Sequence, residues 1–384
     1  MKVYLDNAAT TPIHPKVFER MKPFLTNEFG NPSSVHSFGR SVRVAIEEAR
    51  ETVASFINAD PSEIYFTSGG TEANNFVLRG ISYTASAEFN KKRVITSKAE
   101  HHSVLDTVED LWDKGFERGW IEFNPETELN LDSLLSSAGA DTILGSLMHV
   151  NNETGIINDI EKIASGLKQK NIFFHSDAVQ SFGKFPIDVK KLGIDSLTGS
   201  AHKINGPKGT GFAFIKSGTP VSPLLFGGSQ ERNRRGGTEN AAGIAGFAEA
   251  VRLSRESMQF NFDYVKSLKK LFLEGIQSID KDGITIKDQS KTSPYILSVT
   301  FKSDFYNNDS ESMLIFMDIN GLAASNGSAC TSGTIKASHV LLAMGYSLED
   351  AAGTLRFSFG TLNTPEEIAY ALEVIQKMAK KFRK

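Results

Sequence analysis

The feature that most constrains the fold is a series of short apolar runs separated by segments with helical periodicity. The runs are Ile64–Thr67, Arg93–Thr96, Thr142–Val150, Ile172–His175 and Ile194–Thr198. Each has the length of a buried strand, whereas apolar positions at three- and four-residue steps, as in residues 46–57 and 159–168, indicate helices. Strands that alternate with helices predict an α/β domain with a largely parallel sheet. Ligands bind such sheets where strands end and loops begin.

The pattern changes after residue 257, where long helical segments surround a single strand-like run, Ile296–Phe301. The final helix has an N-cap residue, a first-position proline and a capping-box acid at Thr364, Pro365 and Glu367. We therefore expect two parts, a large domain over residues 15–257 and a smaller α+β domain formed by residues 1–14 and 258–384.

Composition excludes several classes of function. The 42 basic and 45 acidic residues give a net charge of −3 and are interspersed, so no basic face for nucleic acid is expected. No apolar run approaches the roughly 20 residues of a membrane helix. The single cysteine, Cys330, cannot form an internal disulfide or a multi-thiolate metal site, which favours a reducing, cytoplasmic location. Its thiol is either an inert buried group or a reactive one.

A glycine-rich turn follows the first predicted strand. Residues Ser68-Gly69-Gly70-Thr71 lead into a helix, an arrangement that directs free main-chain N–H groups and the helix dipole at an anion. The turn lacks the Lys-Ser/Thr ending of a P-loop, so a nucleoside triphosphate is not the expected ligand. Taken alone, such a turn is more often only a turn.

Two charged residues stand at the ends of later strands. Asp177 follows the strand Ile172–His175, and Lys203 follows the next strand, 26 residues further on. By itself Asp177 is more simply a helix N-cap, and paired with His175 it resembles half of a metal site, although no cysteines or clear third ligand accompany the pair. A lysine inside a site can lose its proton and form a Schiff base, but most lysines are solvated surface charges.

Taken together, the three segments indicate one cofactor. A phosphate cradle, an acid for a pyridinium nitrogen and a lysine for an aldehyde are the three groups that bind pyridoxal 5'-phosphate. Their coincidence in one chain is far less expected by chance than any single match, so we predict a pyridoxal-phosphate enzyme without a metal.

Beyond these groups, the chain resembles the cysteine desulfurases of the NifS/IscS class, which are class-V aminotransferase-like enzymes. The resemblance spans nearly the whole chain and is carried by residues 4–12, 67–75, 99–102, 149–155, 177–180, 200–209 and 325–332. It implies the fold of the pyridoxal-phosphate-dependent transferases (fold type I), in which helices flank a mixed, mostly parallel sheet.

The resemblance also implies roles for individual residues. Lys203 corresponds to the Schiff-base lysine, Asp177 to the partner of the pyridinium nitrogen, and His101 to a residue that stacks on the ring and assists proton transfer. Without the resemblance, His101 would be a satisfied histidine on a loop. The remaining cofactor-binding positions implied are Gly70, Thr71, Asn152, Gln180, Ser200, His202 and Thr238, the last reaching the phosphate of a neighbouring subunit and so implying a homodimer.

For the substrate end, Arg356 is expected to bind the carboxylate bidentately, assisted by Asn7, although Arg356 could instead form a structural ion pair. Cys330 lies among small residues, which predicts an exposed loop with an accessible thiol. The resemblance implies that the protein converts L-cysteine to L-alanine, forms a persulfide on Cys330 and passes the sulfur to an acceptor. That acceptor would be an iron–sulfur scaffold or a carrier for tRNA thiolation.

Four other functions remain open from the sequence. A selenocysteine lyase or a cysteine-sulfinate desulfinase would share the cofactor chemistry. A non-catalytic sulfur carrier would keep the thiol but would not need the Lys203, Asp177 and His101 set. A metal hydrolase using His175 and Asp177 is the most distant alternative.

Overall fold

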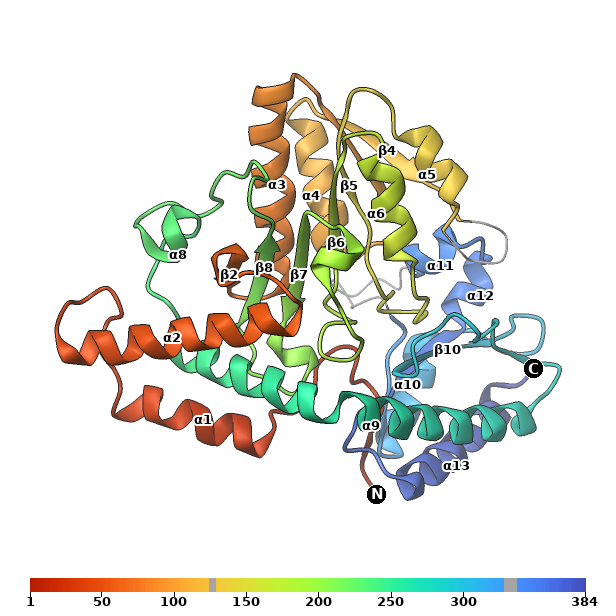
Figure 1. Ribbon diagram of the computed structural model, residues 1–384. Helices are drawn as coiled ribbons and strands as arrows, with labels where there is room; N and C mark the ends of the chain where they lie inside the picture. Colours follow the sequence, from red (N-terminus) through yellow and green to blue (C-terminus); the bar gives the residue numbers. More distant parts are fainter. Residues whose placement is uncertain (124–128, 328–336) are drawn as a thin grey trace.

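The computed structural model describes residues 1–123, 129–327 and 337–384, and its central element is a seven-stranded sheet (Figure 1). In spatial order the strands are β2 (Ile64–Thr67), β8 (Gly211–Ile215), β7 (Ser196–Ser200), β6 (Phe173–Asp177), β5 (Thr142–Ser146), β3 (Arg93–Ser97) and β4 (Glu117–Ile121). β8 runs antiparallel to both of its neighbours, and all other neighbouring pairs are parallel. The mixed, mostly parallel sheet expected from the sequence is confirmed.

Helices cover both faces of this sheet. One face carries α3 (Gly70–Phe89) and α4 (His102–Asp113). The other carries α1 (Pro15–Thr26), α2 (Ser37–Phe56), α5 (Leu131–Ser137), α6 (Ile160–Lys168) and the first part of α9 (Ala241–Ile279). Successive side chains of a strand point to opposite faces of the sheet. In β8, Ala213 and Ile215 therefore pack on the face covered by α3 and α4, and Phe212 and Phe214 pack on the other face.

A second, smaller core surrounds an antiparallel sheet of three strands. The sheet contains β12 (Thr354–Ser358), β10 (Ile296–Phe301) and β9 (Ile284–Thr285), and a parallel pair, β1 (Val3–Tyr4) and β11 (Leu322–Ala323), lies in the same apolar cluster. The accompanying helices are α10 (Ser310–Ile319), α11 (His339–Ala343), α12 (Leu348–Ala352) and α13 (Pro365–Phe382). The expected capping box of the last helix is confirmed, since Thr364 and Glu367 cap each other's main chain.

Helix α9 joins the two cores. Its first part, including Phe247 and Val251, packs with the large sheet, and its last part, including Leu268 and Phe272, packs in the smaller core. Figure 1 shows it running beneath the sheet and on to α13. The helix is continuous through residue 257, so the boundary placed there falls inside one rigid element, and the division into two domains stays a prediction.

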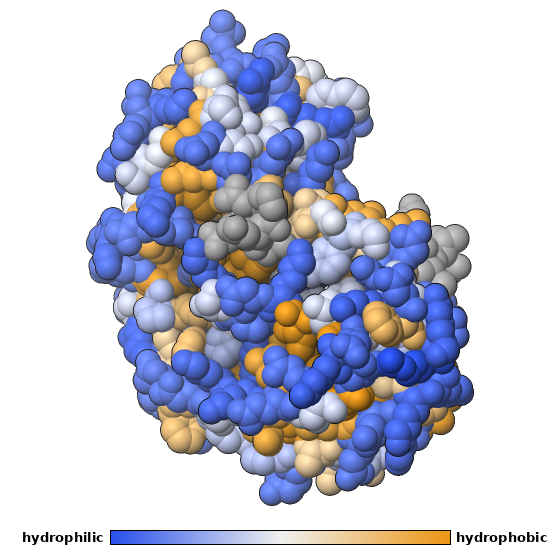
Figure 2. Space-filling view, turned by 90° about the vertical axis from the view of Figure 1, so that its right-hand side faces the viewer, coloured by the Kyte–Doolittle hydropathy of each residue, from blue (hydrophilic) through white to orange (hydrophobic). Residues whose placement is uncertain are grey.

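The surface is hydrophilic over most of the face shown in Figure 2, where apolar side chains occur in small groups. Within the described ranges, no helix combines the length and apolar character needed to cross a membrane. Two further short helices, α7 (Val189–Leu192) and α8 (Gln230–Asn233), lie in the connections around the large sheet.

Candidate active site

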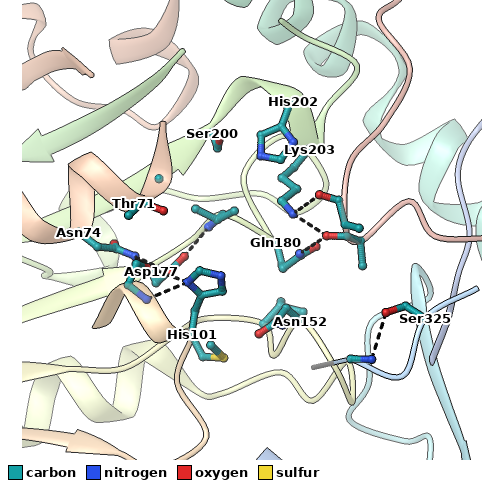
Figure 3. Close-up of a pocket in the computed structure, with 18 of the residues that line it drawn as sticks. Thr71, Asn74, His101, Asn152, Asp177, Gln180, Ser200, His202, Lys203 and Ser325 are labelled. Carbon is teal, nitrogen blue, oxygen red and sulfur yellow. Dashed lines mark hydrogen bonds between the residues drawn. The ribbon is translucent and has the colours of Figure 1, made fainter. Parts of the chain in front are cut away.

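A cavity of about 480 Å³ lies at the carboxyl ends of the central strands, where the two cores meet. Ten of the residues expected at the site line it, namely Gly70, Thr71, His101, Asn152, Asp177, Gln180, Ser200, His202, Lys203 and Arg356. Figure 3 shows Thr71 and Ser200 at one end and Ser325 at the other, with Asp177, His101 and Lys203 between them. Segments up to 350 residues apart in the chain, at Asp6 and Arg356, therefore meet in one place.

One end of the cavity is shaped to receive an anion. It is formed by the first turn of α3, whose leading main-chain N–H groups have no partner inside the helix. Gly69 precedes this turn with a φ of +154°, and a Cβ on Gly70 would lie 2.7 Å from a methyl group of Val179. The two glycines therefore allow the main chain to approach closely, while Thr71 and Ser200 add hydroxyl groups.

Asp177 ends β6 with its carboxylate in the cavity. One carboxylate oxygen accepts a hydrogen bond from Asn74 Nδ2 (2.8 Å), and the other accepts one from the main-chain N–H of Val179 (2.9 Å). Asn74 in turn accepts a hydrogen bond from the hydroxyl of Thr198 (2.6 Å). Asp177 caps a turn rather than a helix, and its carboxylate is held in a fixed orientation where it can receive a cationic group.

His101 is the N-cap of α4, and its Nδ1 lies 2.8 Å from the hydroxyl of Ser103. Its ring lies next to Asp177 in the cavity (Figure 3). Burial lowers the pKa of His101, the Asp177 carboxylate raises it and Lys203 lowers it, with a net decrease. A mostly neutral imidazole that is held at one nitrogen can lie flat against a ring and exchange a proton.

Lys203 closes the short helical turn after β7 and points into the cavity. Its Nζ donates hydrogen bonds to the main-chain oxygens of Ala8 (2.6 Å) and Ala9 (2.7 Å), on the segment after β1. Burial lowers the pKa of Lys203 to about 8, aided by the nearby Arg356 and opposed by Asp177 and Asp6. The amine therefore reaches its reactive, neutral form far closer to neutral pH than an exposed lysine does.

Three buried polar atoms of the cavity wall have no hydrogen-bond partner among the described residues. They are Asn152 Oδ1, Gln180 Oε1 and Arg356 Nε. Buried polar groups are normally paired, so these atoms indicate a polar ligand in the cavity. Together with the anion end, the carboxylate and the lysine, they fit pyridoxal 5'-phosphate and an amino-acid carboxylate.

Arg356 lies at the opposite end from α3, in the middle of β12. Its guanidinium donates to the main-chain oxygen of Asn152 (2.9 Å) and forms a salt bridge with Asp6 (2.8 Å). Only 6% of the Arg356 side-chain surface is exposed to solvent, so a carboxylate that enters here meets a desolvated and oriented cation. Arg356 therefore forms the structural ion pair considered from the sequence, with Asp6, and it also lines the cavity.

Two expected site residues lie outside the cavity wall, and a third is not among the described residues. The Asn7 amide is bound to the main chain of Ser358 (3.0 Å) outside the cavity wall, and its neighbour Asp6 lines the cavity instead. Thr238 lines a separate small cavity of about 90 Å³ together with Ser68. Cys330 is outside the described residues. The roles expected for these three residues stay predictions.

Sequence reasoning missed four contributors to the site. Asn74 holds Asp177, Ser103 holds His101, Asp6 pairs with Arg356, and the Ala8 carbonyl accepts from both Lys203 and Gln180. Asp6 and Ala8 lie in the N-terminal run that carried the resemblance, and Asn74 lies one turn after the glycine turn. The polar side chains of Asn74, Ser103 and Asp6 were visible in the sequence, but tertiary contacts decide which groups they bind. The role of the Ala8 main-chain carbonyl left no signal in the sequence.

His175, considered above as a metal ligand with Asp177, has other partners. It is fully buried and lies within hydrogen-bond distance of the hydroxyls of Ser146 (2.8 Å) and Thr198 (3.4 Å). Across the described residues, no three His, Cys, Asp or Glu side chains are grouped so as to hold a metal ion.

Comparison with known proteins agrees with this geometry. The family model for class-V aminotransferases, a pyridoxal-phosphate-dependent family, matches residues 3–370. The chain is 42% identical to the cysteine desulfurase IscS of Dictyoglomus turgidum over 382 residues, covering 100% of this chain and 95% of that protein. A solved NifS-like protein superposes with a TM-score of 0.91 at 34% identity, with both chains covered completely.

A solved structure described as SspA in complex with cysteine has a TM-score of 0.81 at 32% identity, covering 94% of this chain and 100% of that one. Sequence and fold thus agree over the full length of the chain. The chain belongs to the class-V aminotransferase family and, within it, to the cysteine desulfurases of the IscS/NifS type.

Proposed function

We propose that this protein binds pyridoxal 5'-phosphate on Lys203, removes sulfur from L-cysteine to leave L-alanine, and carries the sulfur as a persulfide on Cys330. The observation that carries the proposal is the placement of the Lys203 amine, the Asp177 carboxylate and the α3 N-terminus around one cavity. The cavity is also lined by Arg356 and by Ser325 and Gly327. The last two residues lie just before the segment that holds Cys330.

The residues around the cavity would hold the cofactor by three kinds of contact. The phosphate would accept hydrogen bonds at the first turn of α3 and from Thr71, Ser200 and His202. Burial lowers the pKa of His202 to about 4, so its imidazole is neutral at physiological pH. Asp177 would keep the ring nitrogen protonated, and His101 would cover one ring face. The bound cofactor supplies an electron sink for the pair of electrons left when a substrate C–H bond breaks.

The protein's own groups perform the proton and sulfur transfers. Arg356 would orient the substrate carboxylate, and the Lys203 amine, whose pKa is lowered to about 8, would take the proton from the substrate Cα. The Cys330 thiolate would attack the substrate sulfur, so that one S–S bond forms as the C–S bond breaks and its electron pair stays on the substrate carbon. Protonation of that carbon completes alanine, and one cysteine plus one thiol thus gives one alanine plus one persulfide.

A direct assay tests the proposal. The purified holoenzyme, incubated with L-cysteine and a reductant, should release L-alanine and sulfide in equal amounts. Borohydride reduction should bleach the cofactor absorbance and fix the cofactor on the peptide that contains Lys203. A colourless protein that yields no alanine would instead support the non-catalytic sulfur carrier.

The lowered pKa of Lys203 predicts a pH dependence of cofactor uptake. The neutral amine attacks the aldehyde, and its fraction rises as pH passes upward through about 8. Uptake of pyridoxal phosphate by the apoprotein should therefore accelerate from pH 6 to 8 and level off above the pKa. Stopped-flow absorbance measures it, and a rate that keeps rising to about pH 10.4, the ordinary lysine value, would contradict the assigned environment.

Substitution of the substrate-binding arginine should act mainly on binding. R356K keeps one positive charge but loses the bidentate fork, and we expect the KM for cysteine to rise about tenfold with a smaller change in kcat. The exposed residue Lys208 provides the matched control, K208R, which should leave both constants unchanged. If R356K leaves the KM unchanged, Arg356 acts only as the structural partner of Asp6.

We also propose a homodimer and delivery of the sulfur to an acceptor protein, such as one that assembles iron–sulfur clusters. Apolar side chains are strongly exposed in the connection between α1 and α2 and beside α8, at Phe29 (73%), Val35 (84%) and Phe226 (82%). Both segments lie at the left of Figure 1 and suit burial against a second copy. Thr238 follows α8 and would then reach the other subunit's cofactor phosphate.

A further inference from the structure

A buried carboxylate at the edge of the active site contacts both described flanks of the Cys330 segment. The carboxylate belongs to Glu153, which is 4% exposed and follows directly after Asn152 of the cavity wall. On one flank, a Cβ on Gly327 would lie 2.6 Å from its Oε2, so the glycine main chain packs against it with a φ of +85°. On the other flank, the Ser338 hydroxyl donates a hydrogen bond to the same oxygen.

The turn that carries Glu153 is itself held firmly. The Asn151 side-chain oxygen accepts hydrogen bonds from the main-chain N–H groups of Glu153 and Thr154 (both 2.9 Å), and its Nδ2 donates to the Ala99 carbonyl (3.0 Å). The Asn152 carbonyl accepts from Arg356 (2.9 Å). This turn therefore joins the segment before His101 to the substrate-binding arginine.

The flanks have further ties to the same region. Ser325 exchanges main-chain hydrogen bonds with Arg356 (2.6 and 3.2 Å), and the His339 imidazole donates to the Glu100 carbonyl (2.9 Å). The flank before the Cys330 segment thus lies beside Arg356, and the flank after it lies next to Glu100. Glu153 contacts the first flank at Gly327 and the second at Ser338. Burying a carboxylate costs free energy unless it is paired. Burial raises the pKa of Glu153, and the Ser338 hydroxyl, Arg356 and His102 oppose that rise.

We infer that Glu153 is a positioning residue that fixes both ends of the Cys330 segment beside Arg356 and thereby sets the rate at which the Cys330 thiol takes sulfur from the substrate. The inference rests on the proposed function, because it assumes that Cys330 is the acceptor. Glu153 is assigned no contact with the cofactor or the substrate. Substitution of Glu153 should therefore slow sulfur transfer while leaving the binding of cofactor and substrate intact.

Single-turnover kinetics of the holoenzyme measure the effect. The protein is mixed with L-cysteine, quenched and alkylated, and the persulfide on Cys330 is quantified by mass spectrometry over time. E153A should lower this rate by about tenfold or more, because misplacement of a reacting group by about 1 Å has effects of that size. E153Q keeps an oxygen that accepts from Ser338 and should lose less. E161Q, which changes an exposed glutamate on α6, is the control.

A double-mutant cycle separates positioning from general damage. S338A should slow persulfide formation by a larger factor in the wild-type background than in E153A, because E153A has already lost the hydrogen bond between the two side chains and only the N-cap that Ser338 provides to α11 remains to be removed. The KM for cysteine and the cofactor absorbance of E153A should stay within about twofold of the wild type.

Three results would overturn this inference without overturning the proposed function, provided that the wild type forms alanine and persulfide normally. One is persulfide formation by E153A at the wild-type rate, and another is S338A and E153A effects that multiply in the double variant. A loss of cofactor absorbance in E153A equal to the loss of rate would also overturn it. If the wild type forms alanine but takes no sulfur on Cys330, the proposed function fails and the inference fails with it.

Discussion

K203A is expected to lower alanine formation from L-cysteine by about four orders of magnitude, because losing a residue that takes part directly in catalysis has effects of that size. Lys203 is the only lysine among the described residues that line the cavity, so no neighbouring amine there can replace it. Its Nζ is held by two main-chain carbonyls, and its pKa of about 8 suits both attack on an aldehyde and removal of a substrate proton.

The measurement is steady-state release of L-alanine with saturating pyridoxal phosphate present. The control is K208A, which removes an exposed lysine from the same turn and should retain wild-type activity. Circular dichroism should show that K203A is folded, because the hydrogen bonds that the Lys203 amine donates go to the segment after β1. A K203A rate above about one hundredth of the wild type would show that another group performs the proton transfer.

C330S is expected to form no persulfide and to make alanine at no more than about one hundredth of the wild-type rate. A thiolate is a strong nucleophile toward sulfur, whereas the serine hydroxyl is un-ionised at neutral pH and cannot replace it. The pyridoxal-phosphate absorbance and the change in it on cysteine addition should persist, because C330S leaves Lys203, Asp177 and the first turn of α3 unchanged.

The control for C330S is C330A, which has no hydroxyl and should behave in the same way. Both variants are assayed for alanine and for protein-bound sulfur. If C330S forms alanine and transferable sulfur at the wild-type rate, the sulfur leaves the substrate without Cys330, and the mechanism proposed above is wrong.

The sequence predicted the fold where local signals and burial agree. Strands β2 and β10 match their expected bounds, and the Thr364 capping box begins the last helix as expected. Strand β8 was not predicted, and neither was its antiparallel course, because a short apolar run carries no information about the direction in which it pairs. The continuity of α9 through residue 257 was missed because its two halves pack in different cores.

The same contrast holds at the site. Asp177, Lys203 and the turn at Gly70 could be identified because each stands at the end of a strand, where the fold places ligands. The positions of Asp6 and Glu153 depend on contacts with residues roughly 170 to 350 positions away, and no local pattern encodes such partners. A buried carboxylate that joins two flanks of a distant segment becomes visible only in three dimensions.

Mass spectrometry of the intact holoenzyme and its peptides, after incubation with L-cysteine, is the direct test of sulfur transfer from cysteine to Cys330. We expect the mass of one added sulfur atom on the peptide that contains Cys330, removed by a reductant and absent when L-alanine or K203A is used. Alanine production with Cys330 recovered only as an unmodified thiol, before any reductant is added, would contradict it.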